Sequence, residues 1–453
     1  MPLDPTLVQY VDTHLERFVR LLERFVAQPS VSAHGEGIEA MASLVEAALA
    51  DAGLDVVRGA TAGNPILLGT SEGASPRRVL FYNHYDVQPA DPGDGWESPP
   101  WTPTRREGRL FGRGVADNKG NLAARIAAVH ALRAVRGTLP AGVTFVVEGE
   151  EEIGSPHLPA FVADHRDRLA ADGCIWETGG VDWEGAPLLT LGCKGVLVVE
   201  LRARGANRDL HSSYGPIVPN PAWRLVWALA SIKGPDERIL VDGWEDDCIP
   251  PRERELALAD ALPDETAALL TNLGLPRFLD GLEGRALRRR LLFGCSATIN
   301  GLSAGYAGPG VKTILPHEAR AKLDFRLVPG QRPADLAAKL RRHLDAHGFD
   351  DIEILSADGE PAARSDPDAP FVRLVIDTAA AVYGRPPVIS PTMTGAGPMA
   401  AFTDLLGLPV ATSGCSHPDS RAHGPNENIR LDDFRQAILH AAAILDALPA
   451  LPG

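Results

Sequence analysis

A strongly apolar stretch that ends in a cluster of acids constrains the fold of this chain more than any other feature. Residues 141–147, AGVTFVV, predict a buried β-strand, and four acids follow within five positions: Glu148, Glu150, Glu151 and Glu152. Like charges this close repel one another beside a low-dielectric interior. The strand must therefore end either at a solvated face, the usual place for an acid run, or at a site where bound cations neutralise the acids.

Strands and helices alternate toward both ends of the sequence. Helices are expected at 5–27, 36–53, 121–135, 371–384 and 431–447, and strands at 77–87 and 143–152. This alternation predicts an α/β domain in which helices flank a mixed, largely parallel sheet. In such sheets ligands bind beyond the carboxyl ends of the strands, which is where the acid cluster lies.

The middle of the chain has a different pattern. Strands expected at 195–205, 295–305, 317–328 and 351–357 combine with helices at 220–232 and 333–348 in the order β-α-β-β-α-β. That order is typical of a split, ferredoxin-like α+β unit, here interrupted at about 235–290 by mostly helical sequence. We therefore expect a catalytic domain of residues 1–193 and 362–453, with residues 194–361 inserted as a second domain.

Composition excludes several classes of partner. The net charge of −15 over 453 residues argues against nucleic acid, which requires a basic face. The sequence shows no signal peptide and no apolar run near the ~20 residues of a membrane span. Its five scattered cysteines form no C-x-x-C pair, so a disulfide framework and a cysteine zinc site are both disfavoured. A cytoplasmic protein without nucleic-acid or membrane partners is expected.

Further metal-ligand residue types occur at comparable strand ends and loops. They are His84 and Asp86 in NHYDVQP, Asp117 in GVADNKGN, Glu177 in ETGG and His423 in AHGPNE. Each has an ordinary alternative: a lone histidine is more often structural, Asp117 could cap a helix, and Glu177 could be a surface acid. Their joint pattern indicates instead a shared metal site.

The chain resembles the M20 metallopeptidase family in these segments and in four more, which follow one another in the same order as in that family: EGEEEIGS, DLHSSYGP, GLSAGYAGPGVKTILP and LDFRLVPG. The resemblance is closest to its carnosinase-like dipeptidase branch. It implies a catalytic domain with an inserted lid and dimerisation domain.

The resemblance also implies two divalent metal ions. Asp117 would bridge both ions, His84 and Glu177 would complete one, and Glu152 and His423 the other. Zinc is the default because the ligands mix histidine and carboxylate, although manganese or cobalt would also fit. Two cations bring +4, three carboxylates −3 and a bridging hydroxide −1, so this centre would be neutral.

Catalytic roles follow from the same resemblance. Glu151 would be the general base. It would take a proton from the water molecule bound between the two ions and pass that proton to the leaving amine. Asp86 would orient His84 without touching metal. His211 would reach across a homodimer, formed through the inserted domain, to stabilise the oxyanion. Its alternative is a turn histidine outside the site.

Three further residues would bind the substrate. Arg326 resembles an arginine that grips the terminal carboxylate, although it could also be a strand-surface arginine. Gly395 and Gly397 resemble a glycine-rich loop that cradles the same group. Gly397 stands where the carnosinase-like branch has serine, and Glu177 where that branch usually has aspartate.

The predicted function is therefore a dinuclear metal-dependent hydrolase of dipeptides or short peptides with a free C-terminal carboxylate. One alternative is an N-acyl-amino-acid deacylase that uses the same site. Another, from a different class, is a non-catalytic homologue that binds small ligands. The motif GLSAG at 301–305 is not expected to be a serine nucleophile elbow, because no helix follows it.

Overall fold

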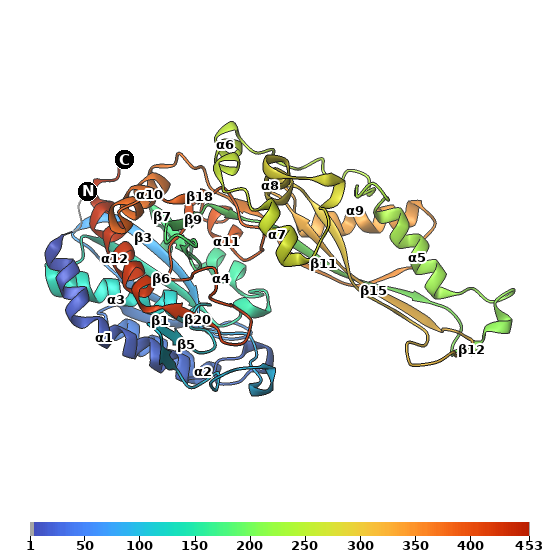
Figure 1. Cartoon of the computed structure of the whole chain (residues 1–453), viewed down its shortest axis with the longest axis horizontal. Coiled ribbons are helices and arrows are strands. Elements are labelled where there is room, and N and C mark those ends of the chain that lie inside the picture. The colour runs from blue at the N-terminus through green and yellow to red at the C-terminus, as the bar shows by residue number, and fades with distance from the viewer. Residues whose placement is uncertain (1–3, 453) are drawn as a thin grey trace.

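A computed structural model describes residues 4–452 and shows two bodies of different shape (Figure 1). The larger body contains both ends of the chain, and the smaller, elongated body is formed by its middle. The α/β prediction with an inserted α+β unit is thus confirmed.

A six-stranded sheet forms the centre of the larger body. Its order is β1-β2-β6-β3-β7-β19, with β1 (Asp55–Gly59), β2 (Ile66–Ser71), β6 (Ala141–Glu148), β3 (Ser75–His84), β7 (Gly173–Trp176) and β19 (Val410–Thr412). The four strands from β6 to β19 are parallel neighbours, and β1 and β2 are antiparallel. Every residue of β6 is buried, as expected of a strand covered on both faces.

Helices cover both faces of this sheet. Alternate residues of β3 point to opposite sides, so Val79 and Phe81 join one core cluster while Leu80 and Tyr82 join the other. The first cluster is covered by α1 (Pro5–Ala27), α2 (Ile38–Asp51), α3 (Lys119–Arg136), α10 (Pro370–Tyr383) and α12 (Leu431–Ala447). The second lies beneath α4 (Leu158–Asp164) and α11 (Ala400–Thr403).

Short strands complete the larger body. One small sheet contains β20 (Asn428–Arg430), β5 (Arg109–Phe111) and β4 (Thr104–Arg106), and another contains β18 (Val388–Ser390), β9 (Pro187–Thr190) and β8 (Gly180–Val181). The two connections to the middle of the chain pair with each other as β10 (Gly192–Cys193) and β17 (Ala363–Arg364). We propose that one domain comprises residues 1–193 and 362–453 and the other residues 194–361, because both boundaries fall at this pair of strands.

The smaller body has an antiparallel sheet of order β13-β15-β11-β16. Its strands are β11 (Gly195–Arg204), β13 (Ser296–Ala304), β15 (Glu318–Leu327) and β16 (Glu353–Glu360), and α5 (Pro221–Ile232) and α9 (Pro333–Ala346) pack against it. The chain order is therefore the predicted β-α-β-β-α-β. GLSAG lies in and just after β13 and no helix follows it directly, so its exclusion as a nucleophile elbow is confirmed.

Two further parts of the smaller body matter for the site. Between α5 and β13 lie three helices, α6 (Glu253–Ala261), α7 (Thr266–Leu273) and α8 (Gly284–Phe293), which we call the helical insert. At the other end of the sheet, β12 (Leu210–His211) pairs with β14 (Ile314–Leu315). Figure 1 shows this pair at the tip farthest from the larger body.

Candidate metal centre

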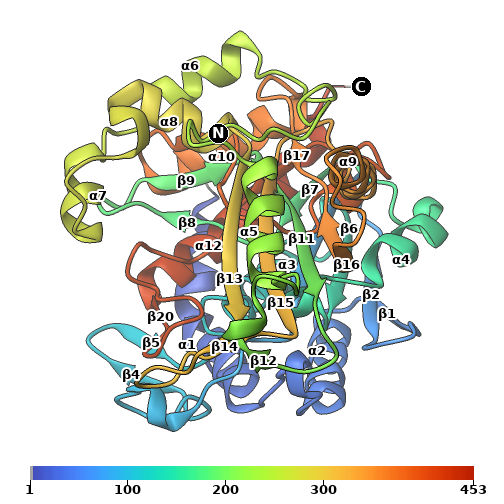
Figure 2. The ribbon, with the colours of Figure 1, turned by 90° about the vertical axis from the view of Figure 1, so that its right-hand side faces the viewer.

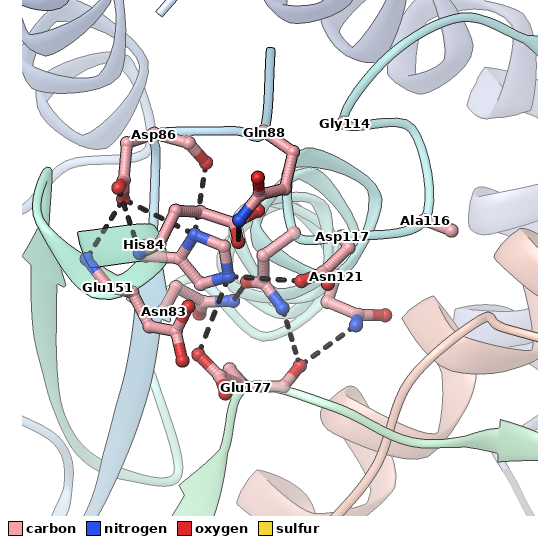
Figure 3. A network of polar contacts seen from close by, with 12 residues as sticks. Asn83, His84, Asp86, Gln88, Gly114, Ala116, Asp117, Asn121, Glu151 and Glu177 are labelled. Atoms are coloured by element: carbon pink, nitrogen blue, oxygen red, sulfur yellow. Dashed lines mark hydrogen bonds and ion pairs between the residues drawn. The ribbon is translucent and has the colours of Figure 1, made fainter. Parts of the chain in front are cut away.

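Strand ends bring the predicted ligands together. His84 is the last residue of β3, Glu151 and Glu152 begin a short 3-10 helix soon after β6, and Glu177 follows β7 directly. Because β6, β3 and β7 are parallel neighbours, their carboxyl ends meet at one edge of the sheet. Figure 3 shows His84 at the centre of this group, with Asp117 and Glu177 facing it.

Asp117 lies between two histidines that are far apart in the sequence. Its Oδ1 is 3.0 Å from Nε2 of His84, and its Oδ2 is 3.2 Å from Nε2 of His423. A carboxylate that presents one oxygen to each of two histidines has the arrangement of a bridging ligand.

Each histidine has a second carboxylate beside it. Oε2 of Glu177 is 3.5 Å from Nε2 of His84, and Oε2 of Glu152 is 3.3 Å from Nε2 of His423. These five residues therefore form two groups that share Asp117, one with His84 and Glu177 and the other with His423 and Glu152.

Asp86 supports the group from behind His84. Its backbone oxygen lies 3.0 Å from Nδ1 of His84, and its carboxylate accepts hydrogen bonds from the backbone N–H groups of Glu151 and Glu152, at 3.2 and 3.0 Å. Asp86 thus fixes a histidine ligand and both glutamates at once, without joining the group that faces Asp117.

The structure also contains supporting residues that the sequence analysis did not identify. Glu427 is fully buried, and its carboxylate accepts hydrogen bonds from the backbone N–H groups of Gly114, Ala116 and Asp117 and from the Arg113 side chain. It holds the loop that carries Asp117 against the segment that carries His423. Its signal in the sequence was its place at the end of the segment AHGPNE.

A buried arginine holds the other side of the centre. Arg125 donates to the backbone oxygens of Tyr82, Trp176, Glu177 and Ser413, which joins the ends of β3 and β7 to the loop after β19. The side-chain amides of Asn118 and Asn121 donate to the same Glu177 oxygen, at 2.9 and 2.8 Å. The Glu177 backbone oxygen therefore accepts three hydrogen bonds, one from the side chain of each of these three residues.

The electrostatics of the centre favour positive charge. The hydrogen bonds with Asp117 and Glu152 raise the pKa of His423 to about 10. Burial by itself would raise the pKa of Asp117, but its hydrogen bonds with His423 and His84 outweigh burial and lower it. Burial, together with the charge of Glu177, raises the pKa of Glu151 well above its ordinary value.

These residues fit a pair of divalent cations. Two sets of three residues, which both include His84, have ligand atoms close enough together to hold an ion: His84, Glu151 and Glu177, and His84, Asp117 and Glu152. His423 lies beside Asp117 and Glu152 of the second set. Oε2 of Glu177 is buried and has no hydrogen-bond partner, so it is free to act as a ligand. Imidazole with carboxylate is the donor set of zinc and related ions.

The two remaining acids of the run, Glu148 and Glu150, lie outside this centre. Glu148 is buried and accepts hydrogen bonds from the hydroxyls of Tyr82 and Ser155, at 2.7 and 2.8 Å. Glu150 accepts from the backbone N–H of Asn64 and contacts His157. Burial raises the pKa of Glu148 to about 8. The acid run is thus tolerated partly because Glu148 and Glu150 have hydrogen-bond partners of their own.

The glycine-rich loop lies beside the predicted base. A Cβ built on Gly397 would meet Oε1 of Glu151 at 3.7 Å and the ring of Trp176 at 2.7 Å. Serine, the residue of the carnosinase-like branch, would therefore need Trp176 to move. The backbone oxygen of Gly395 accepts a hydrogen bond of 2.9 Å from the N–H of Lys194, next to the domain junction.

Arg326 and His211 lie at opposite ends of the inserted sheet. Arg326 is opposite Val196 on β11, two residues beyond Lys194, so it lies at the end that joins the larger body. His211 is exposed at the distal tip, with Nδ1 2.9 Å from Oγ of Ser213. The structure does not bring His211 to the centre of its own chain.

Comparison with known proteins agrees with this geometry. Residues 80–447 match peptidase family M20/M25/M40. The chain belongs to this family. It is 31% identical to the human Beta-Ala-His dipeptidase over 367 residues, which cover 74% of this chain and 70% of the relative. It is 28% identical to the Cys-Gly metallodipeptidase dug1 of Schizosaccharomyces pombe, over 97% of this chain and 96% of the relative.

Solved structures extend the similarity to the whole fold. An M20 family metallo-carboxypeptidase, Sso-CP2 from Sulfolobus solfataricus, superposes with a TM-score of 0.91 at 35% identity, over 96% of this chain and 99% of that chain. Human carnosine dipeptidase 1 superposes with a TM-score of 0.79 at 26% identity, over 98% and 99% of the two chains. This chain is therefore an M20 peptidase in sequence and in fold.

Proposed function

We propose that this chain is a dinuclear-metal peptidase that hydrolyses dipeptides or short peptides with a free C-terminal carboxylate. The observation that carries the proposal is Asp117, whose two oxygens lie 3.0 Å from His84 at the end of β3 and 3.2 Å from His423 in the loop before β20. A structural ion would need only one such group. Two groups that share a carboxylate are typical of hydrolytic sites with paired metals.

The residues divide the work as follows. His84, Asp117, Glu152, Glu177 and His423 would hold the two ions, which when bound would polarise the substrate carbonyl and increase the acidity of a water molecule. Glu151 takes the proton from the attacking water and delivers it to the leaving amine. Asp86 keeps His84 and the Glu151 backbone in position through the hydrogen bonds described above.

Zinc is the proposed ion, with manganese or cobalt as alternatives, because the donors mix imidazole with carboxylate. The proposed compartment is the cytoplasm, because all five cysteines are free. No helix in residues 4–452 is both long and apolar enough to cross a bilayer.

Dipeptides are the favoured substrates because the relatives named above act on Beta-Ala-His and Cys-Gly. N-acyl amino acids remain the second candidate, favoured by Glu177 and Gly397 at positions where the carnosinase-like branch has other residues. The metal-reconstituted enzyme should hydrolyse members of a dipeptide panel faster than the corresponding N-acetyl amino acids. The reverse order would assign the chain to the deacylases, and no hydrolysis of either set would contradict the proposal.

Arg326 is the proposed clamp for the terminal carboxylate. Its nearest acid is Asp324, at 3.5 Å, and its side chain is 35% exposed, so the guanidinium can reach a ligand. Arg326→Ala should raise KM about ten- to hundredfold for substrates with a free carboxylate, because a hydrogen bond to a charged group contributes about 1.5–3 kcal/mol. Amidated dipeptides should be unaffected.

A matched control lies on the same strand. Arg320 has a similar side-chain exposure, 41%, and pairs with Glu200 and Glu318. Arg320→Ala should leave both substrate classes unchanged. Equal losses on free and amidated substrates in Arg326→Ala would remove Arg326 from the clamp.

A homodimer through the inserted domain would let His211 serve the partner's centre. Large apolar side chains are exposed on the same domain, including Ile217, Trp223 and Trp227, at 79%, 59% and 55%. Exposed groups of this kind mark association surfaces. We expect His211→Ala and Glu151→Gln each to be nearly inactive alone.

Mixing the two variants tests whether His211 acts in trans. Subunit exchange should restore about a quarter of wild-type activity, because half of the dimers would be mixed and each would have one complete site. Full activity of His211→Ala, or a monomer that is fully active at micromolar concentration, would contradict the dimeric site. No restoration on mixing would indicate that His211 acts within its own chain.

A further inference from the structure

A cavity of about 650 Å³ lies between the helical insert and the larger body. Its walls come from the segment that includes β8 and β9, from β18 with the residues that follow it, and from α7 and α8. Figure 2 shows α7 beside β8 and β9. The volume is within the range of about 300–1,000 Å³ that is typical of small-molecule sites, which often lie between domains.

The walls of this cavity are mainly apolar, and two of their charged side chains, Arg288 and Asp182, already have partners. Leucines of the insert face it together with Trp183, Val388 and Met393. Arg288 is hydrogen-bonded to backbone oxygens of residues 259, 260 and 263, and the Asp182 carboxylate accepts from the N–H groups of its own turn. The cavity therefore offers apolar contacts to a ligand, but no unpaired cationic side chain that would bind a ligand's carboxylate.

The cavity begins beside the metal centre. Thr178 on its wall directly follows Glu177, so their Cα atoms are only about 3.8 Å apart. Thr394 on the opposite wall directly precedes Gly395, in the loop whose Gly397 lies against Glu151. A substrate held at the centre would therefore have this cavity next to its scissile bond.

We propose that this cavity binds the acyl half of the substrate and selects a bulky apolar residue, or an apolar N-acyl group, at that position. The inference rests on the proposed function, which supplies the direction of binding. Arg326, Lys194 and Arg290 lie near one another toward the domain junction, and none of them lines the cavity. The terminal carboxylate is attracted to that side, and the acyl half extends the other way, under α7 and α8.

Leu291 is the residue of choice for a test. It faces the cavity from α8, and it is 48% exposed, so replacement should not unfold the domain. Leu273, at the end of α7, is 57% exposed and does not line the cavity, which makes Leu273→Asp a matched control for Leu291→Asp. The substrates are Gly-Ala, Leu-Ala, Phe-Ala and N-hexanoyl-alanine.

The wild-type enzyme should prefer Leu-Ala and Phe-Ala to Gly-Ala by about tenfold or more in kcat/KM, because each methylene in an apolar pocket contributes several-fold. Leu291→Asp should lower kcat/KM by about tenfold for the apolar substrates, N-hexanoyl-alanine included, and less than about twofold for Gly-Ala. Leu273→Asp should match the wild type on all four. A wild-type preference for Gly-Ala, or an equal loss on every substrate in Leu291→Asp, would overturn the proposal.

A binding measurement separates this proposal from the catalytic one. N-acetyl-leucinamide has no free carboxylate, and Trp183, which is 72% exposed, should report its entry by fluorescence. Saturable binding should weaken about tenfold in Leu291→Asp, remain in Leu273→Asp and lose its signal in Trp183→Phe. Absence of any saturable signal in the wild type would overturn the cavity assignment. Binding without hydrolysis of any substrate would instead contradict the proposed function.

Discussion

Glu151→Gln should lower kcat by about 10²–10⁴-fold, the contribution typical of general acid–base catalysis, while two metal ions stay bound. Glutamine is nearly isosteric with glutamate but cannot accept the proton of the attacking water. The backbone N–H of Glu151 would still donate to Asp86, so the local structure should persist. Steady-state kinetics on a dipeptide panel, with metal content from mass spectrometry of the same preparation, would measure both effects.

Glu150→Gln provides the matched control. This neighbouring acid is buried, and it contacts Asn64 and His157 instead of the metal centre. We expect its kcat to remain within a few-fold of the wild type. Near-normal turnover in Glu151→Gln, or loss of metal from that variant, would remove Glu151 from the role of general base.

Asp117→Asn should reduce bound metal from about two ions per chain toward zero and abolish turnover. Asp117 is the carboxylate that faces both His84 and His423, so its charge stabilises both ions at once. The variant Glu177→Gln should have a smaller effect on metal binding, because Glu177 lies beside His84 and not beside His423. Glu177→Gln should lose one ion and keep the other.

Metal titration followed by calorimetry would distinguish the two variants. Two binding events in Asp117→Asn with wild-type affinities would contradict a shared ligand. If Glu177→Gln lost both ions to the same extent as Asp117→Asn, Glu177 would not belong to one ion alone. The assignment of His84 with Glu177 to one ion, and of His423 with Glu152 to the other, would then be wrong.

Part of the centre could be predicted from local sequence because strand ends are local features. The apolar runs before His84, before Glu148 and before Glu177 indicate buried strands, and parallel neighbours place their carboxyl ends at one edge. The helices 5–27 and 431–447 were likewise predicted at their observed limits from their helical spacing. In these elements periodicity and burial agree, so the pattern is sufficient.

The rest of the centre depends on contacts between distant segments. Asp117 and His423 lie on loops, where no periodicity indicates a position. Their residue types made them candidates, but the resemblance to a family was needed to assign them to particular ions. The buried carboxylate of Glu427 joins these loops through four donors, and its own motif does not reveal that role. Likewise, the sequence indicates that residues 235–290 are mostly helical, but not that α7 and α8 cover a cavity beside the site.

The sequence by itself determined the two kinds of domain, the order of their strands and helices, and the residue types able to hold metal, because hydrophobic periodicity and side-chain chemistry are written along the chain. Only the tertiary structure decided that Glu427 and Arg125 hold the ligand segments together, that His211 lies at a tip remote from the centre of its own chain, and where the apolar cavity lies. Those features arise from packing between segments separated by hundreds of residues, and no local pattern specifies such contacts.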